Sequence, residues 1–151
     1  MTSQQLAKAR LIWSAIGSVL LKKYKRDKTF LDYTTPWELL VAVILSAQTT
    51  DELVNKITPA LFKKYPTAQK LAAAPISDIE PYVQKVNYFR MKASYLKKTA
   101  EKIVKDFDGS VPLDIDKLQT LSGVGRKTAV AVMTNLAPEP YGIPVDTHVI
   151  R

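Results

Sequence analysis

The stretch LSGVGRKTA, residues 121–129, places two glycines in a short turn and two cations at the start of the segment that follows. Gly123 and Gly125 can adopt positive φ angles, and their lack of side chains lets a partner approach the backbone closely. If a helix follows, its first N–H groups point outward, where the helix dipole favours an anion. Arg126 adds a positive charge for a neighbouring phosphate. The stretch therefore predicts a hairpin that binds a phosphate backbone, and the alternative interpretation is a simple helix–helix turn.

Outward from this hairpin, nearly every segment has the apolar spacing of a helix, and no alternating strand pattern occurs. The spacing predicts a short helix over 115–121 and another over 127–136, so that a helix–hairpin–helix motif occupies 115–136. Upstream, ELLVAVILSA at 38–47 is apolar on all sides and predicts a buried central helix. The sequence therefore predicts an all-α, multi-helix globule with short loops.

The central helix has a clear start in the sequence Thr35-Pro36-Trp37-Glu38. Thr35 is a suitable N-cap, and Pro36 fits the first helical position because its fixed φ suits a helix. Glu38 is placed to reach back and close a capping box with Thr35. We therefore expect the helix to begin at Pro36.

The composition favours a polyanionic partner. The 151 residues carry 22 Lys and Arg against 14 Asp and Glu, a net charge of +8, which favours nucleic acid first and an anionic membrane second. The absence of cysteine excludes a disulfide, a thiolate zinc site and an iron–sulfur cluster held by these residues. The apolar run at 39–47 is too short to span a bilayer, and no cleavable signal pattern begins the sequence. We expect an intracellular protein, in the cytoplasm and nucleoid or in a nucleus, with no membrane partner.

Lys127 stands directly behind the hairpin, beside Arg126 and at the positive end of a predicted helix. This setting opposes a second positive charge, and a lysine that gives up its proton can act as a nucleophile and form a Schiff base. The alternative is an ordinary surface lysine or a phosphate contact. Lysine chemistry of this kind needs a carboxylate. Of the two nearest downstream carboxylates, Glu139 lies in a proline-rich loop, whereas Asp146 is placed at a predicted helix start.

Three motifs in this order resemble those of one enzyme family. PWELLVAVILSAQTTD at 36–51, LSGVGRKTA at 121–129 and VDTH at 145–148 are similar to the endonuclease III family of DNA glycosylases, within the helix–hairpin–helix superfamily. The similarity extends from about Tyr33 to Arg151. It implies an endonuclease III-like fold and a role in base-excision repair. The implied activity releases damaged, oxidised pyrimidines from duplex DNA and cleaves the strand at the abasic site.

The resemblance also implies catalytic roles for two residues. Lys127 matches the family's catalytic lysine, whose amine attacks the sugar C1′, displaces the base and forms a Schiff base that permits β-elimination. Asp146 matches the aspartate that assists deprotonation of the lysine and stabilises positive charge developing on the sugar. A lysine at position 127 implies the bifunctional glycosylase and abasic-site lyase branch. His148 is the sole histidine, and we interpret it as structural, because a lone histidine does not form a metal site.

Further residues match the family's DNA contacts. Gln48 matches the glutamine that fills the space left by a flipped base, and such enzymes insert side chains because flipping costs stacking and pairing energy. Tyr88 aligns with an inserted wedge, where the family typically has leucine after glycine and this chain has tyrosine after Asn87. An aromatic wedge and a core residue are both open interpretations for Tyr88. The hairpin residues expected to contact the DNA backbone are Gly123, Val124, Gly125 and Arg126.

Family members typically continue past VDTH with further helices, and many end with four cysteines that bind a 4Fe-4S cluster. The resemblance therefore implies no cofactor held by these residues, and a cluster only if the natural protein continues past Arg151. We expect residues 31–151 to form a helical glycosylase domain and residues 1–30 an amphipathic helix of an incomplete second lobe. The apolar face from Leu6 to Leu20 would then lack its partner and could pair two copies of the chain.

Three alternatives to the leading hypothesis stay open. The first is a mismatch glycosylase that removes thymine or uracil opposite guanine. The second is a non-catalytic helix–hairpin–helix module that only grips the DNA backbone. The third is an inactive truncated chain, because a carboxylate as close to the terminus as Asp146 is easily lost from its place.

Overall fold

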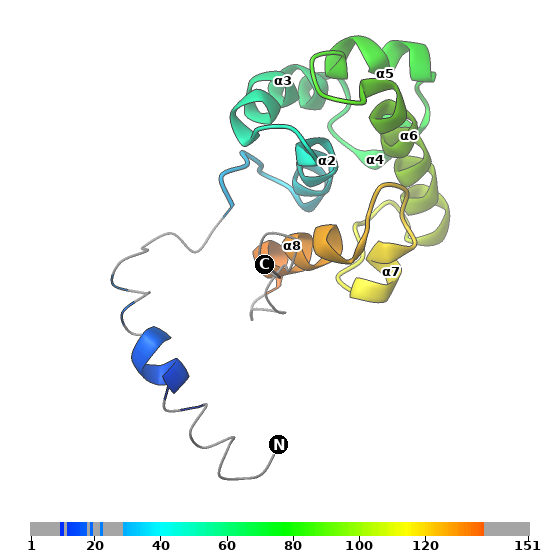
Figure 1. The fold of residues 1–151 in the computed structure, drawn as a ribbon. Coiled ribbons are helices and arrows are strands. Elements are labelled where there is room, and N and C mark those ends of the chain that lie inside the picture. Colours follow the sequence, from blue (N-terminus) through cyan, green and yellow to red (C-terminus); the bar gives the residue numbers. More distant parts are fainter. Residues whose placement is uncertain (1–9, 11, 18, 20–21, 23–28, 138–151) are drawn as a thin grey trace.

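The computed structural model describes residues 10, 12–17, 19, 22 and 29–137. Within 29–137 the described residues are α-helical with connecting loops and contain no strand, so the predicted all-α class is confirmed (Figure 1). The helices there are α2 (Pro36–Ser46), α3 (Asp51–Lys64), α4 (Ala68–Ala72), α5 (Ile76–Val83), α6 (Phe89–Asp106), α7 (Ile115–Gln119) and α8 (Arg126–Leu136).

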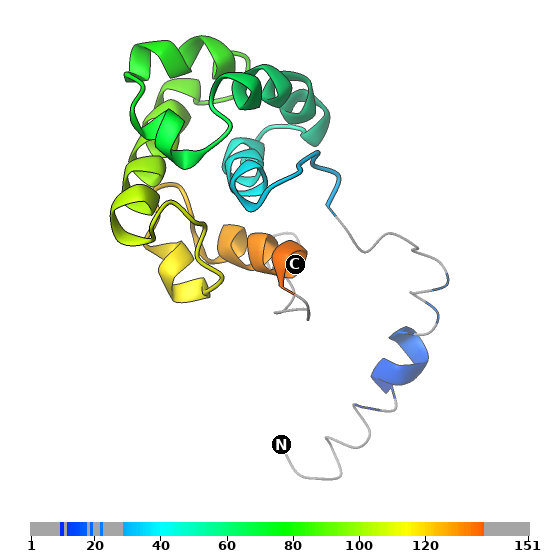
Figure 2. The same ribbon diagram turned by 180° about the vertical axis from the view of Figure 1, so that it is seen from behind.

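The predicted central helix is α2. Leu39, Leu40 and Leu45 are fully buried, and α2 contacts α3, α6 and α8. Figures 1 and 2 show α2 between these helices from both sides of the molecule. An all-apolar helix is stable in water only when neighbours cover it on every side, so the other helices are arranged around α2.

The start of α2 matches the sequence in part. The Thr35 hydroxyl accepts a hydrogen bond from the Glu38 N–H at 3.2 Å, so Thr35 is the N-cap as predicted. The predicted capping box is wrong in its second half. The Glu38 carboxylate accepts from both the N–H and the hydroxyl of Thr34, each at 2.6 Å, because Thr34 offers two donors to one carboxylate oxygen.

Thr35→Ala is expected to lower the free energy of unfolding by about 1 kcal/mol, because an orphan N–H of the first turn of α2 loses its acceptor. Urea denaturation followed by circular dichroism measures the change. Thr34→Ala is the matched control. It removes a neighbouring hydroxyl but keeps the backbone N–H bond to Glu38, so it should cost less than Thr35→Ala. Equal losses for the two variants would contradict the capping assignment.

The long helix α6 connects the two parts of the molecule that carry the candidate site residues. It packs against α4, α5 and α2, with Ala93 and Leu96 fully buried. Farther along, the Thr99 hydroxyl donates to the carbonyl of Ser122 at 2.8 Å. Because Ser122 belongs to the hairpin between α7 and α8, this bond fixes the hairpin to α6.

The predicted amphipathic helix of residues 1–30 falls only partly within the described residues. Residues 12–17 are helical, and their apolar side chains Ile12, Trp13 and Ile16 are exposed. The two-part division of the chain and the pairing of two copies through this helix stay predictions.

Candidate functional site

The hairpin between α7 and α8 has the predicted form, with one difference in its backbone. Gly123 adopts φ +77°, a conformation that favours glycine, whereas Gly125 is extended at φ −84° and ψ 178°. The expectation that both glycines use positive φ is therefore confirmed for Gly123 and wrong for Gly125. One left-handed residue is enough to reverse the chain, and Gly125 serves as the N-cap of α8, where extended backbone is usual.

Gly123 is also required by its close approach to α6. A Cβ atom at this position would lie 2.7 Å from Cδ2 of Tyr95, which is closer than carbon atoms can pack. A Cβ at Gly125 would meet no atom within 4 Å. Position 123 therefore requires glycine both for its backbone conformation and for lack of room for a Cβ atom. Position 125 requires glycine for neither reason.

The hairpin presents backbone rather than side chains. Val124 is 5% exposed and anchors the turn in the core, while Gly123, Gly125 and Arg126 are exposed. No side chain caps α8 at Gly125, so the first N–H groups of this helix have no side-chain acceptor from the cap residue. An exposed helix start of this kind, with Arg126 beside it, can bind an anion through N–H groups.

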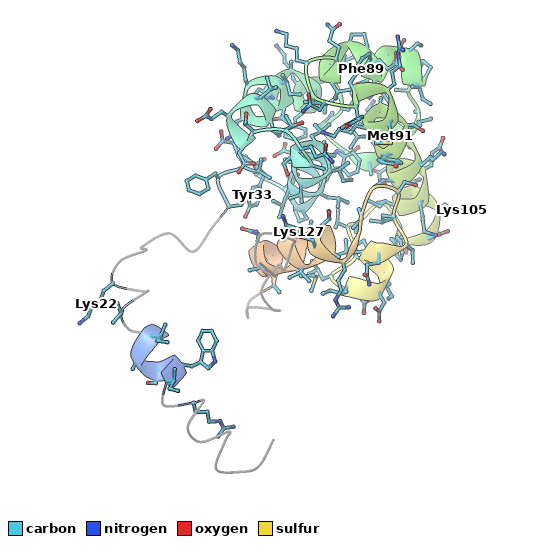
Figure 3. All side chains as sticks on the ribbon, in the orientation of Figure 1. Lys22, Tyr33, Phe89, Met91, Lys105 and Lys127 are labelled. Carbon is cyan, nitrogen blue, oxygen red and sulfur yellow. The ribbon has the colours of Figure 1, made fainter. Side chains whose placement is uncertain are left out.

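Lys127 lies in the first turn of α8 and is exposed (Figure 3). Its helix packs against α2 and α7, so the backbone position of Lys127 is set by the same contacts that hold the hairpin. Three residues downstream of Lys127 lie outside the described residues, namely Glu139, Asp146 and His148.

The structure brings Gln48 and Tyr88 together from loops that are far apart in sequence. Gln48 follows the end of α2 at φ +55°, and Tyr88 is the N-cap of α6 at φ +56°. The side-chain amide of Asn87 donates to the carbonyl of Gln48 at 2.6 Å. Gln48 is exposed and Tyr88 is 62% exposed, so the interpretation of Tyr88 as a core residue is wrong.

The sequence reasoning missed Lys92, which is only 3% exposed. Its ammonium group donates to the carbonyls of Leu45 and Ala47 at 2.8 and 2.7 Å and to the hydroxyl of Thr49 at 3.0 Å. Burial lowers the pKa of Lys92, whereas the carbonyls at the negative end of α2 favour its charged form. A lysine within the apolar stripe of an amphipathic helix, next to Ala93 and Leu96, is the pattern that could have revealed it.

A cavity of about 180 Å³ joins these features. Its walls include Gln48 and Tyr88 from the two loops, Gly123 from the hairpin, and Met91, Lys92 and Tyr95 from α6. The structure therefore gathers three of the sequence-predicted segments on one surface, and α6 supplies the wall between them.

Among the residues that the structure describes, no cluster of three or more His, Cys, Asp or Glu side chains could hold a metal ion. In the same part of the chain, no helix is both long and apolar enough to cross a membrane.

Comparison with known proteins gives the family. The model described as "HhH-GPD superfamily base excision DNA repair protein" matches residues 41–151. The chain belongs to the HhH-GPD superfamily. Within this superfamily the chain is similar to endonuclease III of Synechocystis sp., with 48% identity over 133 residues, a match that covers 88% of this chain and 61% of that protein.

Two solved endonuclease III structures match the fold of this HhH-GPD chain. One is a non-covalent endonuclease III–DNA complex, with TM-score 0.81 and 38% identity over 99% of this chain and 66% of the other. The second is a trapped endonuclease III–DNA covalent intermediate, with TM-score 0.81 and 37% identity over 98% of this chain and 66% of the other. The chain spans less than two thirds of the length of the curated relative from Synechocystis.

Proposed function

We propose that this HhH-GPD chain acts in base-excision repair as a bifunctional enzyme on duplex DNA. It releases oxidised pyrimidines by cleaving the N-glycosidic bond and then nicks the strand at the abasic site. The observation that carries the proposal is the single surface where Gln48, Tyr88 and Gly123 line one cavity, close in sequence to Lys127 at the start of α8. The endonuclease III relatives, one of them trapped as a covalent DNA intermediate, support the same assignment.

Lys127 is the proposed nucleophile. Its neutral amine attacks the sugar C1′, the bond from C1′ to the base breaks, and the base leaves with a proton. The C1′–O4′ bond then breaks and the second amine proton passes to O4′, which gives a Schiff base between Nζ and C1′. Removal of a 2′ proton then expels the 3′ phosphate by β-elimination, and water releases the lysine. Asp146 is the proposed carboxylate that assists deprotonation of the amine and stabilises the positive charge on the sugar.

The remaining site residues are proposed to hold the DNA. The N–H groups around Gly123, Val124 and Gly125 bind a backbone phosphate, and Arg126 neutralises a neighbouring one. Gln48 and Tyr88 fill the space that a flipped base leaves in the duplex. Their contacts offset the few kcal/mol that unstacking and unpairing cost.

Residues 1–151 contain no cysteine, so they supply no thiolate ligand for an iron–sulfur cluster. We propose that the lysine chemistry above uses no cofactor held by these residues. Damaged or abasic duplex DNA is the proposed partner, and the protein is inferred to work inside the cell, where this substrate lies.

A panel of labelled duplexes tests the proposed activity. Each duplex carries one central 5-hydroxycytosine, one abasic site, one G/T mismatch, one G/U mismatch or no lesion, and nicking is followed on a denaturing gel. The proposal expects cleavage of the 5-hydroxycytosine and abasic duplexes only. Preferential release of thymine or uracil opposite guanine would favour the mismatch glycosylase instead. Binding without cleavage of any duplex would favour a non-catalytic module.

Arg126→Ala is expected to weaken binding to an undamaged duplex and to make the slope of log K against log salt less negative by about 1, because one fewer phosphate is neutralised. Fluorescence anisotropy at several potassium chloride concentrations measures the slope. Lys105→Ala removes the same charge from an exposed position distant from Lys127 (Figure 3) and should leave the slope unchanged. An unchanged slope for Arg126→Ala would exclude Arg126 from the interface.

A further inference from the structure

Gln48 and Tyr88 share an unusual backbone conformation. Both are non-glycine residues in the left-handed region, at φ +55° and +56°, and both are exposed. Such residues persist only where the surrounding structure holds them. Because both residues are exposed, their own burial does not hold them, and the restraint comes from neighbouring groups.

Lys92 restrains the backbone on both sides of Gln48. Its three ammonium protons are matched by three acceptors, the carbonyls of Leu45 and Ala47 before Gln48 and the hydroxyl of Thr49 after it. An ammonium group has three donors, so the buried amine is fully used in these bonds and has none left for a ligand. The turn that carries Gln48 is therefore tied to α6.

The same lysine also contacts the second residue of the pair. The backbone N–H of Lys92 donates to the carbonyl of Tyr88 at 3.0 Å, in the first turn of α6. Asn87, the residue before Tyr88, donates from its side-chain amide to the carbonyl of Gln48 itself. Two residues thus connect the turn at Gln48 and the turn at Tyr88 through both backbone and side-chain bonds.

We propose that Asn87 and Lys92 are positioning residues that hold Gln48 and Tyr88 as one rigid pair, so that both side chains enter the duplex together. This inference rests on the proposed role of Gln48 and Tyr88 in filling the space of a flipped base. A pair that is already ordered in the free protein loses little conformational freedom when it enters DNA, which favours insertion.

The test uses a duplex with a non-cleavable abasic analogue beside 2-aminopurine, whose fluorescence rises when the base is unstacked. Asn87→Ala removes the amide without changing charge at an exposed position. The equilibrium constant for insertion, taken from the fluorescence at saturating protein, should fall about three- to tenfold, the effect of losing one hydrogen bond. Affinity for the undamaged duplex should change less than about twofold. Gln84→Ala, which removes an exposed amide three residues earlier, should change neither quantity.

Lys92→Met is the second test variant, and it should reduce the 2-aminopurine fluorescence more than Asn87→Ala does. Circular dichroism shows whether this variant folds. If Lys92→Met does not fold, the Asn87→Ala result decides the proposal alone. A double-mutant cycle adds a readout that general destabilisation would not move: Asn87→Ala should have a smaller effect on insertion in a Gln48→Ala background, where only the Tyr88 side chain is left to be positioned. Additive losses would overturn the proposal.

Two outcomes distinguish the proposed function of Gln48 and Tyr88 from the positioning role of Asn87 and Lys92. If Gln48→Ala and Tyr88→Ala leave the 2-aminopurine signal unchanged, their proposed function in DNA is wrong. If those variants abolish the signal while Asn87→Ala and a folded Lys92→Met retain it, the proposed function stands and the positioning role is wrong.

Discussion

Lys127→Ala is expected to abolish the covalent complex that borohydride traps between the wild-type chain and a duplex carrying one abasic site. Alanine has no side-chain amine, so no Schiff base can form at this position for borohydride to reduce. Strand nicking should fall by at least about a thousandfold, because loss of a nucleophile removes the whole covalent route. Affinity for undamaged DNA should change by no more than the loss of one charge requires. Trapping is scored on a denaturing protein gel, and nicking is measured in single-turnover reactions.

Lys105→Ala is the matched control, since it removes one exposed lysine that lies apart from Lys127 (Figure 3) and should trap as well as the wild type. Trapping that survives Lys127→Ala would exclude this lysine as the nucleophile. Absence of trapping by the folded wild-type chain would contradict the proposed activity for these 151 residues, and DNA binding would then be their remaining role.

Gly123→Ala is expected to lower the free energy of unfolding by about 2–4 kcal/mol. Part of this loss comes from placing alanine at φ +77°, and the rest from a Cβ that would lie 2.7 Å from the ring of Tyr95. Urea denaturation measures the loss, and anisotropy with an undamaged duplex shows whether the displaced hairpin still binds. Binding should weaken because the backbone N–H groups no longer converge on one phosphate.

Gly125→Ala provides the matched control two residues away. Its φ of −84° suits alanine, and a Cβ there meets nothing within 4 Å, so the expected loss is below about 1 kcal/mol. Combining Gly123→Ala with Tyr95→Ala separates the two causes, because it relieves the clash and retains the backbone strain. Equal losses for the two glycine variants would show that neither conformation nor space fixes the hairpin at Gly123.

Local patterns were sufficient to predict the elements that carry the site. The all-apolar run at 38–47 can be stable only inside a helical globule, and it is the buried helix α2. The Gly-Val-Gly turn predicted the hairpin, because chain reversal between two helices needs a residue such as Gly123 at positive φ. The end of the predicted helix over 115–121 was too late by two residues, since α7 ends at Gln119.

The hydrogen bonds between segments that are far apart in the sequence could not be predicted. The amide of Asn87 reaches a carbonyl 39 residues away, and the amine of Lys92 reaches carbonyls 47 and 45 residues away. Such partners depend on how α6 packs against the end of α2, and no spacing rule along the chain encodes that packing. Lys92 lies in the apolar stripe of α6, a pattern that points to burial, but only the folded structure shows which carbonyls its amine binds.

The helix α6 also fixes the spacing between the two proposed DNA contacts. Tyr88 at its start faces the proposed gap in the base stack, and Tyr95, seven residues later, rests against the glycine of the hairpin. Seven residues of α-helix are two turns and about 10 Å, close to three nucleotide steps at about 3.4 Å each. If α6 runs along the strand in the proposed complex, its length between Tyr88 and Tyr95 sets which phosphate the hairpin binds for a given flipped base. Deleting a single residue between Tyr88 and Tyr95 would shorten this spacing by only about 1.5 Å, but it would rotate the hairpin by about 100° around the axis of α6. The hairpin and Tyr88 could then no longer contact the same DNA strand in the proposed register.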